Sequence, residues 1–393
     1  MNTDTISNSD IAIAHWGEHV NGGGDRVGWE ISRIFDDAPL FVGWQDKNIE
    51  PGDISSQQLI NGRVSEWALR RGGVSRMLAH MIGWQIAGPL REYDVLVTSG
   101  NEPLFYVPPT EQTWVAYIHH TNRRQSDQIE AVGDGATTPL KLLFYYLIRV
   151  AFDHNTHKPD LFVANSEQVK RRMTRYWGIP EEKIEVVYPP VDTESYSPTD
   201  APTEEYYLTL SRLDWHKSVD DVIRAFDDLD STLIVAGDGP DRDELERIAG
   251  DNVEFRGYVD ENEKRELLAG AKAFVFNGQD EDFGISPVEA LAAGTPLLGV
   301  EEGMTQFQII DGQNGYTFQR DMTGETIQAA IDRFERDGVE WDAADIETFA
   351  DRFSVQAFHT RIEEAVQRAL EDSRATPDWY PEAGSAPDPS PQE

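Results

Sequence analysis

The sequence predicts an α/β protein of two domains, each a parallel β-sheet with helices on both faces. Short apolar runs of strand length alternate with helical patterns along the whole chain, and this alternation is typical of such sheets. The first half has such runs at 11–16, 40–44, 93–98, 114–118, 161–164 and 184–187, and the second at 207–210, 233–236, 253–255, 273–276 and 296–300. A chain of 393 residues is long enough to bury two separate cores.

The domain boundaries follow from composition. Pro198, Pro202 and the polar residues around them indicate a linker, so we expect an N-terminal domain at 1–195 and a C-terminal domain at 203–350. Helices are expected after the first strand as far as Phe35, and around 65–87. A last helix, with Ser354 as its N-cap, is expected to pack back on the N-terminal domain over 354–371. The tail 376–393, rich in Pro, Ser and Ala, is predicted to be disordered.

The charge of the chain limits its partners. It carries 71 acidic and 34 basic residues, a formal net charge of −37, spread over its whole length. This pattern is typical of a halophile-like protein kept soluble in concentrated salt, and the alternative is an acidic surface that recruits a basic partner. Nucleic acid is excluded as a partner because phosphate backbones need a positive surface. The absence of cysteine excludes disulfides and thiolate metal sites.

The sequence predicts a cytoplasmic protein. Its N-terminus is polar and acidic, unlike a signal peptide, and no apolar run is long enough to cross a bilayer. Residues 139–152 are apolar almost all round, which predicts a core helix or, alternatively, a membrane-facing helix. The basic group Lys170, Arg171, Arg172 and Arg175 indicates a solvated face or, alternatively, a contact with anionic lipid. These alternatives would place the N-terminal domain at the inner face of a membrane as a peripheral protein.

The most informative stretch is 281–289, Glu-Asp-Phe-Gly-Ile-Ser-Pro-Val-Glu. It lies between an apolar strand and a helix, where open α/β sheets bind anionic ligands. Each carboxylate also has a purely structural interpretation. Glu289 completes a capping box that begins at Ser286, and Glu281 lies in an acidic run, 280–282, that is typical of solvated surface.

Two cations occupy the equivalent place after another strand of the second half. Arg212 and Lys217 follow the strand at 207–210, and Ser218 with Asp221 predicts a capping box at the start of the next helix. A fork-shaped cation and a point cation beside a helix N-terminus suit a diphosphate.

The first half offers two further loops. Gly22, Gly23 and Gly24 follow the first strand and precede Asp25 and Arg26, so backbone amides could approach a phosphate or sugar. The loop after 114–118 contains His119, His120, Arg123 and Arg124, a local positive field in a very acidic chain.

The segment from Glu281 to Gly294 resembles the E-x7-E signature of retaining glycosyltransferases of family 4, and particularly a mannosyltransferase-like subgroup that reads E-D-F-G-I-x-P-V-E-A. Three other motifs of that family are matched in part. The family's G-G-x-E-R loop corresponds to Gly22, Gly23 and Arg26, with Asp25 in place of Glu. Its H-T-P-x-R loop corresponds to His120, Thr121 and Arg124, with Asn122 in place of Pro. Its R-x4-K pair corresponds to Arg212 and Lys217. The resemblance covers about residues 10–370.

The resemblance implies the GT-B fold, two facing Rossmann-like domains with the active site in the cleft between them. It implies catalytic roles for Glu281, His120, Arg212 and Lys217, with no metal or other cofactor. The implied donor-binding residues are Gly22, Gly23, Gly24, Arg212, Lys217, Gly257, Tyr258, Phe283, Gly284 and Glu289. His119 and Arg124 are expected near the sugar or acceptor, and either His119 or His120 could face the transferred sugar.

By the same resemblance the activity is transfer of a hexose, preferably mannose, from a nucleotide-diphosphate sugar to a glycan or lipid-linked acceptor. GDP-mannose is the favoured donor, with a UDP-sugar as the alternative because Phe307 stands where the family usually has Glu. Two other function classes stay open: a sugar-nucleotide epimerase of the same architecture, and a non-catalytic protein that binds nucleotide sugars.

Overall fold

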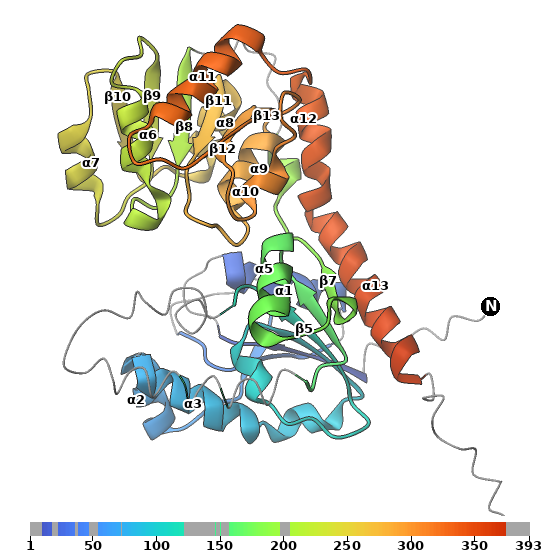
Figure 1. The fold of residues 1–393 in the computed structure, drawn as a ribbon. Coiled ribbons are helices and arrows are strands. Elements are labelled where there is room, and N and C mark those ends of the chain that lie inside the picture. The colour runs from blue at the N-terminus through green and yellow to red at the C-terminus, as the bar shows by residue number, and fades with distance from the viewer. Residues whose placement is uncertain are drawn as a thin grey trace, which may run out of the picture.

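The computed structural model describes residues 10–17, 23–35, 38–46, 54–71, 73–121, 146, 150, 157–196 and 205–374. Most of the segment 139–152, the linker at 197–204 and the tail 376–393 lie outside these residues. The described chain forms two α/β domains, one above the other in Figure 1. This confirms the fold class that the sequence predicts.

The N-terminal domain contains a seven-stranded parallel sheet in the order β3-β2-β1-β4-β5-β6-β7. Its strands are β1 (Ile11–His15), β2 (Leu40–Val42), β3 (Ser56–Gln58), β4 (Val95–Ser99), β5 (Thr113–Ile118), β6 (Leu161–Ala164) and β7 (Ile184–Val186). The central strands are buried at every position, as expected of a parallel sheet covered on both faces. Two apolar clusters, one on each face, form the core of this domain.

The helical segments described in the N-terminal domain are α1 (Gly23–Ile34), α2 (Arg63–Arg71), α3 (Gly73–Gln85), η2 (Gly88–Glu92), η3 (Glu102–Phe105), α5 (Glu167–Arg172), η6 (Met173–Trp177), η7 (Glu181–Lys183) and η8 (Thr193–Ser195). The single helix expected around 65–87 is therefore two helices. Gly73 begins the second of them with a φ of +57°, a left-handed conformation that suits glycine.

The C-terminal domain contains a six-stranded parallel sheet in the order β10-β9-β8-β11-β12-β13. Its strands are β8 (Tyr206–Leu210), β9 (Thr232–Ala236), β10 (Val253–Gly257), β11 (Ala273–Phe276), β12 (Leu297–Val300) and β13 (Gly315–Phe318). Its helical segments are η9 (Trp215–Lys217), α6 (Val219–Ala225), α7 (Arg242–Ile248), α8 (Glu261–Gly270), α9 (Ile285–Ala292), α10 (Thr305–Gln308), α11 (Glu325–Asp337), α12 (Ala343–Ala350) and η10 (Asp351–Phe353). Because β8 and β11 are direct neighbours, the loops that follow them meet at one edge of the sheet.

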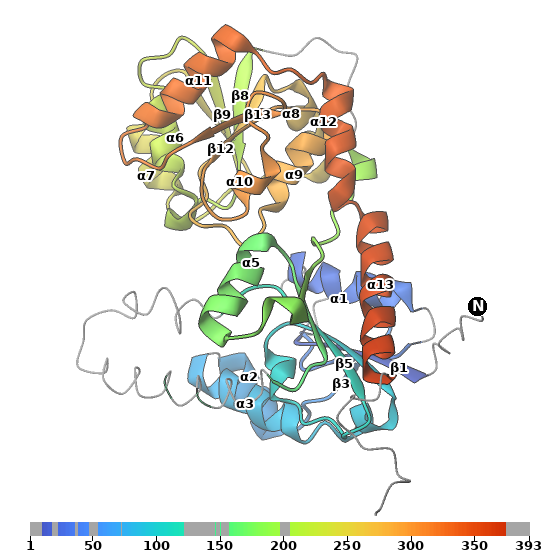
Figure 2. The ribbon, with the colours of Figure 1, turned by 45° about the vertical axis from the view of Figure 1, so that its right-hand side comes forward.

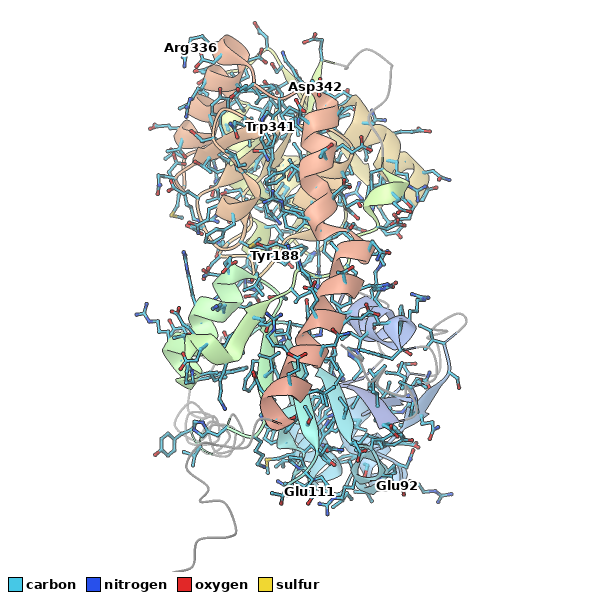
Figure 3. The ribbon with its side chains drawn as sticks, turned by 90° about the vertical axis from the view of Figure 1, so that its right-hand side faces the viewer. Glu92, Glu111, Tyr188, Arg336, Trp341 and Asp342 are labelled. Carbon is cyan, nitrogen blue, oxygen red and sulfur yellow. The ribbon has the colours of Figure 1, made fainter. Side chains whose placement is uncertain are left out.

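Helix α13 (Val355–Arg374) connects the two domains. It leaves the C-terminal domain and runs along the N-terminal domain, as Figures 2 and 3 show, and Ser354 caps it by accepting from the amide of Ala357. Its apolar side contributes Phe358, Ile362 and Val366 to the N-terminal core. His359 lies 2.9 Å from a carboxylate oxygen of Glu30 on α1. In the described part of the chain, no helix combines the length and the apolar character that crossing a bilayer requires.

Candidate active site

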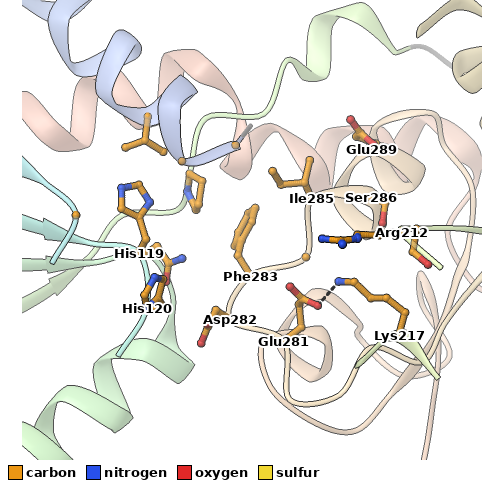
Figure 4. Close-up of a pocket in the computed structure, with 18 of the residues that line it drawn as sticks. His119, His120, Arg212, Lys217, Glu281, Asp282, Phe283, Ile285, Ser286 and Glu289 are labelled. Carbon is orange, nitrogen blue, oxygen red and sulfur yellow. Dashed lines mark hydrogen bonds and ion pairs between the residues drawn. The ribbon is translucent and has the colours of Figure 1, made fainter. Parts of the chain in front are cut away.

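A cavity of about 610 Å³ lies between the two domains (Figure 4). Its walls come from loops at the carboxyl ends of strands in both sheets, where open α/β sheets bind ligands. The sequence-predicted site residues that line it are Gly23, Gly24, His119, His120, Arg212, Lys217, Glu281, Phe283, Gly284 and Glu289. The structure therefore brings ten of the predicted residues, spread over both halves of the sequence, around one space.

The turn at 280–284 links β11 to α9 and is held in an unusual backbone conformation. Asp280 has a φ of +46° and Gly284 a φ of +78°, so both lie in the left-handed region. Gly303 packs against the same turn, and a Cβ added there would lie 2.4 Å from the Glu281 amide nitrogen and 2.5 Å from its carbonyl oxygen. The amide of Met304 also donates to the Glu281 carbonyl at 2.9 Å. The backbone of Glu281 is therefore fixed from the neighbouring loop.

The capping box proposed for Ser286 and Glu289 does not form. Helix α9 begins two residues earlier than that box requires, at Ile285, with Gly284 as its N-cap and no side-chain cap. Glu289 instead accepts a hydrogen bond from Lys264 Nζ at 2.8 Å, in a largely buried position in the cavity wall. A partner from α8 thus replaces the local cap, and the structural interpretation of Glu289 was wrong.

Lys264, which the sequence analysis missed, is tied electrostatically to Glu289. Burial by itself lowers the pKa of Lys264, but Glu289 and Tyr196 outweigh it and hold that pKa above its usual value. Lys264 therefore stays charged and fixes the position of the Glu289 side chain at the cavity edge.

Lys217 and Glu281 form an ion pair inside the cavity, with 2.5 Å between Nζ and Oε2. Figure 4 shows their side chains pointing toward one another from the loops after β8 and β11. The Lys217 ammonium also lies 5.4 Å from the centroid of the Phe276 ring. The guanidinium of Arg212 is 73% exposed and lies 3.6 Å from a carboxylate oxygen of Asp214, so it faces the open part of the cavity.

The second capping box, at Ser218 and Asp221, is also absent. Ser218 adopts a left-handed φ of 43° and does not cap α6 through its side chain. Its hydroxyl accepts from Gln279 and Arg320, while Asp221 accepts from Arg224 and Asn277. Ser218 thus has tertiary partners in place of the local cap, and the short helix η9 (Trp215–Lys217) positions Lys217.

The two predicted histidines form part of the N-terminal wall. His119 Nε2 lies 2.8 Å from the hydroxyl of Ser99, and burial, together with His15 and His120, lowers the pKa of His119 well below its usual value despite Asp25. His119 is therefore neutral at physiological pH. His120 is exposed, and Asn101 donates to its backbone carbonyl at 2.9 Å. Both histidines line the cavity, so both remain candidates for the sugar-facing role.

The glycine-rich segment differs from the expected loop. Gly23 and Gly24 are the first two residues of α1, and Asp25 in its first turn lies 3.4 Å from His15 Nε2 in the buried interior. A Cβ at Gly23 would lie 2.6 Å from the tip of Ile285, so α1 closely approaches α9 of the other domain. Gly22 and Arg124 lie outside the described residues.

Helix α5 contacts the 280–282 turn across the domain boundary. Arg172 is 4% exposed and forms ion pairs with Asp280, at 2.5 Å, and with Asp282. Gln168 donates to Asp280 at 2.7 Å, and the Arg171 guanidinium lies 4.8 Å from the centroid of the Phe307 ring. We call these contacts the α5 interface. The interpretation of Arg172 as part of a solvated or lipid-facing surface was wrong, and the acidic run is not simply solvated.

Comparisons with known proteins agree with this geometry. Residues 60–195 match the family model described as Glycosyltransferase Family 4, and residues 192–352 match the model described as Glycosyl transferases group 1. The lipopolysaccharide outer core galactosyltransferase WaaB superposes with a TM-score of 0.68 at 16% identity, over 91% of this chain and 99% of that one. The chain has the GT-B fold. HepE from Anabaena, solved with UDP and glucose, also has this GT-B arrangement, with a TM-score of 0.66 at 18% identity over 91% of this chain and 99% of that one.

Among curated proteins, this GT-B chain is 30% identical to the glycogen synthase of Mycobacterium tuberculosis over 188 residues, 44% of each chain. It is 27% identical to the O-antigen chain mannosyltransferase RfbU of Salmonella typhimurium, over 40% of this chain and 46% of that protein. The chain thus spans about half the length of the curated relatives it matches. Together with the fold, these matches support a family-4 glycosyltransferase.

Two residues predicted to bind the donor, Gly257 and Tyr258, do not line the cavity of the GT-B cleft. Gly257 ends β10 with a φ of +69°, its carbonyl accepts from the amide of Gly237, and the Tyr258 side chain is 85% exposed. Neither residue lines the cavity, so their contact with a nucleobase stays a prediction.

Proposed function

We propose that this chain is a retaining glycosyltransferase that moves a hexose from a nucleotide-diphosphate sugar to an acceptor hydroxyl. The observation that carries the proposal is the convergence of Arg212, Lys217, Glu281 and Glu289 on one interdomain cavity. Two cations and two carboxylates in a cleft suit a ligand with an anionic diphosphate and hydroxyl-rich ends.

The cations would act on the leaving group. As the sugar–phosphate bond breaks, negative charge develops on the diphosphate, and preorganised cations stabilise that charge more in the transition state than in the bound donor. Lys217 is held by Glu281, whereas Arg212 is exposed to the cavity and can turn toward a ligand. The side chains of Arg212 and Lys217 would thus supply the positive charge that stabilises the departing diphosphate.

The acidic residues would bind the donor at its two hydroxyl-bearing parts. Glu289, fixed by Lys264, suits a ribose diol, and Glu281 with the Phe283–Gly284 turn suits the transferred sugar. One of the histidines, His119 or His120, would approach that sugar from the N-terminal wall. Retention of the anomeric configuration is proposed from the family-4 resemblance.

The mannosyltransferase-like motif favours GDP-mannose as the donor, and the likeness to RfbU is consistent with mannose. A UDP-sugar is the alternative, supported by the UDP-bound HepE structure and by Phe307 in the altered loop. The proposed acceptor is a glycan or lipid-linked saccharide.

A donor screen tests the function. Thermal shift in concentrated salt compares GDP- and UDP-sugars, and the stabilising donor is then incubated with and without a saccharide acceptor pool. We expect one donor class to raise the Tm and to release nucleoside diphosphate when an acceptor is present. Formation of an epimer from donor alone would indicate the isomerase, and stabilisation without turnover in any acceptor pool would indicate the binding protein.

A further inference from the structure

Helices α2 and α3 expose a large apolar surface on the N-terminal domain. Fourteen large apolar side chains are exposed in the described part of the chain, and six of them, Val64, Trp67, Val74, Leu78, Ile82 and Ile86, lie on or at the ends of these two helices. Trp67 is 57% exposed, Ile82 59% and Ile86 75%. Clustering of this kind marks an interaction surface, because exposed apolar residues on soluble proteins are normally scattered.

The two helices are anchored on their other side. Leu69 of α2 and Trp84 of α3 are fully buried in the N-terminal core, and Gly83 lets α3 approach Ile60 closely. Leu78, Ile82 and Ile86 are spaced by four residues and therefore form one stripe on the outer face. Beside them is a groove of about 390 Å³. The exposed stripe is thus a fixed feature of a folded helix pair.

The exposed Arg63 and Arg71 of α2 accompany this apolar face in a chain of strongly negative charge. Arg70 and Arg76 lie near the buried ring of Trp44 instead, and Arg76 donates to the Leu69 carbonyl. Helices α2 and α3 carry four arginines, Arg63, Arg70, Arg71 and Arg76, and one acidic residue, Glu66, whereas the whole chain has a net charge of −37. The Arg71 guanidinium lies 5.2 Å from the centroid of the Trp67 ring, so positive and apolar groups are interleaved. Apolar side chains flanked by basic ones fit the boundary between acyl chains and anionic headgroups.

We propose that the α2–α3 surface, defined by these six apolar residues with Arg63 and Arg71, docks on an anionic lipid bilayer. Figures 1 and 2 place α2 and α3 side by side at the end of the N-terminal domain remote from the C-terminal domain, so the bilayer does not obstruct that domain. This location differs from the alternative lipid contact through Lys170, Arg171, Arg172 and Arg175, a group in which the α5 interface buries Arg172.

The surface also connects to the cleft. Helix α3 packs against η3, and Asn101 and Glu102 at the start of η3 line the cavity. Docking through α3 would hold one wall of the cleft close to membrane-borne acceptors. This consequence, unlike the docking itself, rests on the proposed transferase function.

Vesicle co-sedimentation of the full chain tests the docking, with phosphatidylglycerol vesicles compared with phosphatidylcholine vesicles. We expect sedimentation with the anionic vesicles and about tenfold weaker partition onto the zwitterionic ones. The triple variant Trp67→Ser/Ile82→Ser/Ile86→Ser and the double variant Arg63→Gln/Arg71→Gln should each lower partition onto phosphatidylglycerol by about tenfold or more. The side chains replaced in both variants are exposed, so the fold should be unchanged by circular dichroism.

The matched control changes an equally exposed apolar residue and an exposed arginine of the C-terminal domain, Met322→Ser/Arg247→Gln, and should bind like the wild type. The proposal is overturned if the wild type stays in the supernatant with both vesicles, or if the control loses as much binding as the triple variant. It is also overturned if the wild type is a dimer that the triple variant converts to monomer without any vesicle binding. Donor-induced thermal shift, measured in parallel, reports on the proposed transferase separately.

Discussion

Lys217 Nζ lies 2.5 Å from Glu281 Oε2, joining the loop after β8 to the loop after β11. The two residues are 64 positions apart in the chain, and they meet because β8 and β11 are adjacent parallel strands that end at the same edge of the sheet. The pair places a fixed cation and a carboxylate side by side in the wall of the interdomain cavity.

Substitutions of Lys217 and of Glu281 should affect nucleotide binding and sugar transfer differently. Lys217→Gln removes the cation, so we expect kcat/KM to fall by about a hundredfold, a loss of about 3 kcal/mol in transition-state stabilisation. Glu281→Gln leaves the cation unpaired, so nucleoside diphosphate should bind at least as tightly as in the wild type while transfer is lost. Steady-state kinetics and calorimetric titration measure the two effects, and equal losses of nucleotide affinity in both variants would contradict this division.

The α5 interface should stabilise the turn that carries Glu281. Arg172→Gln leaves Asp280 and Asp282 without their buried cation, and we expect a loss of about 1–3 kcal/mol in the free energy of unfolding together with weaker donor binding. Arg175→Gln, an exposed arginine on the next turn, is the matched control and should change neither quantity. The double variant Asp280→Asn/Asp282→Asn should lessen the effect of Arg172→Gln. Identical behaviour of the Arg172 and Arg175 variants in chemical denaturation would refute this role.

Gly303 should be needed because of its contact with the Glu281 backbone. Gly303→Ala places a Cβ about where that backbone lies, and we expect a cost of about 2 kcal/mol or more and a clear loss of transfer activity. Gly312→Ala is a close control, because Gly312 has a φ of +81° but its added Cβ would meet only Tyr316, at 3.9 Å. Both variants share the left-handed strain, so their difference in Tm and kcat isolates the collision. A Gly312 variant that is as defective as the Gly303 variant would show that strain alone is responsible.

Stability should fall in mildly acidic solution because of His119. Burial depresses the pKa of His119 in the folded state, so below its unfolded pKa, about 6.5, the unfolded chain binds a proton that the folded chain does not. The free energy of unfolding is therefore expected to decrease as pH falls from about 7 to about 5. His119→Gln should reduce this slope in pH-dependent denaturation more than His120→Gln does, because His120 is only a secondary cause of the lowered pKa of His119. Equal slopes in all three proteins would contradict the assignment.

Salt should stabilise the chain. At a net charge of −37, self-repulsion opposes folding, and raising KCl from about 0.1 M to about 1 M shortens the Debye length from about 10 Å to about 3 Å. We expect the Tm to rise over this range by more than it does in an uncharged osmolyte of matched osmolality. A Tm that is unchanged or lower in KCl would count against the halophile-like interpretation of the composition.

The sequence predicted the sheets well because their strands are apolar on both faces. Strand β3 (Ser56–Gln58) was missed because it is a short polar strand at the sheet edge, where burial does not dictate residue type. Strand β13 (Gly315–Phe318), also at an edge, is only four residues long and lacks a clear pattern.

Local motifs pointed to loops that line the interdomain cavity, but not to the partners of the residues in them. Neither of the two capping boxes forms. Glu289 accepts a hydrogen bond from Lys264, and Ser218 accepts one from Arg320, and both of these donors are far away in the sequence. Arg172 looked like a surface residue for the same reason, since its aspartates lie 108 and 110 positions away. Long-range pairing of this kind depends on how the two domains meet, which no local pattern encodes.

Calorimetric titration of nucleoside diphosphate shows whether Arg212, Lys217 and Glu289 bind one common ligand. GDP and UDP are titrated into the wild type and into Arg212→Gln, Lys217→Gln and Glu289→Gln, with the exposed and remote Arg247→Gln as control. We expect one site per chain, a loss of about tenfold in affinity for the same nucleotide in each of the three variants, and wild-type binding in the control. Wild-type affinity in the three variants, or no binding of either nucleotide to the wild type, would contradict it.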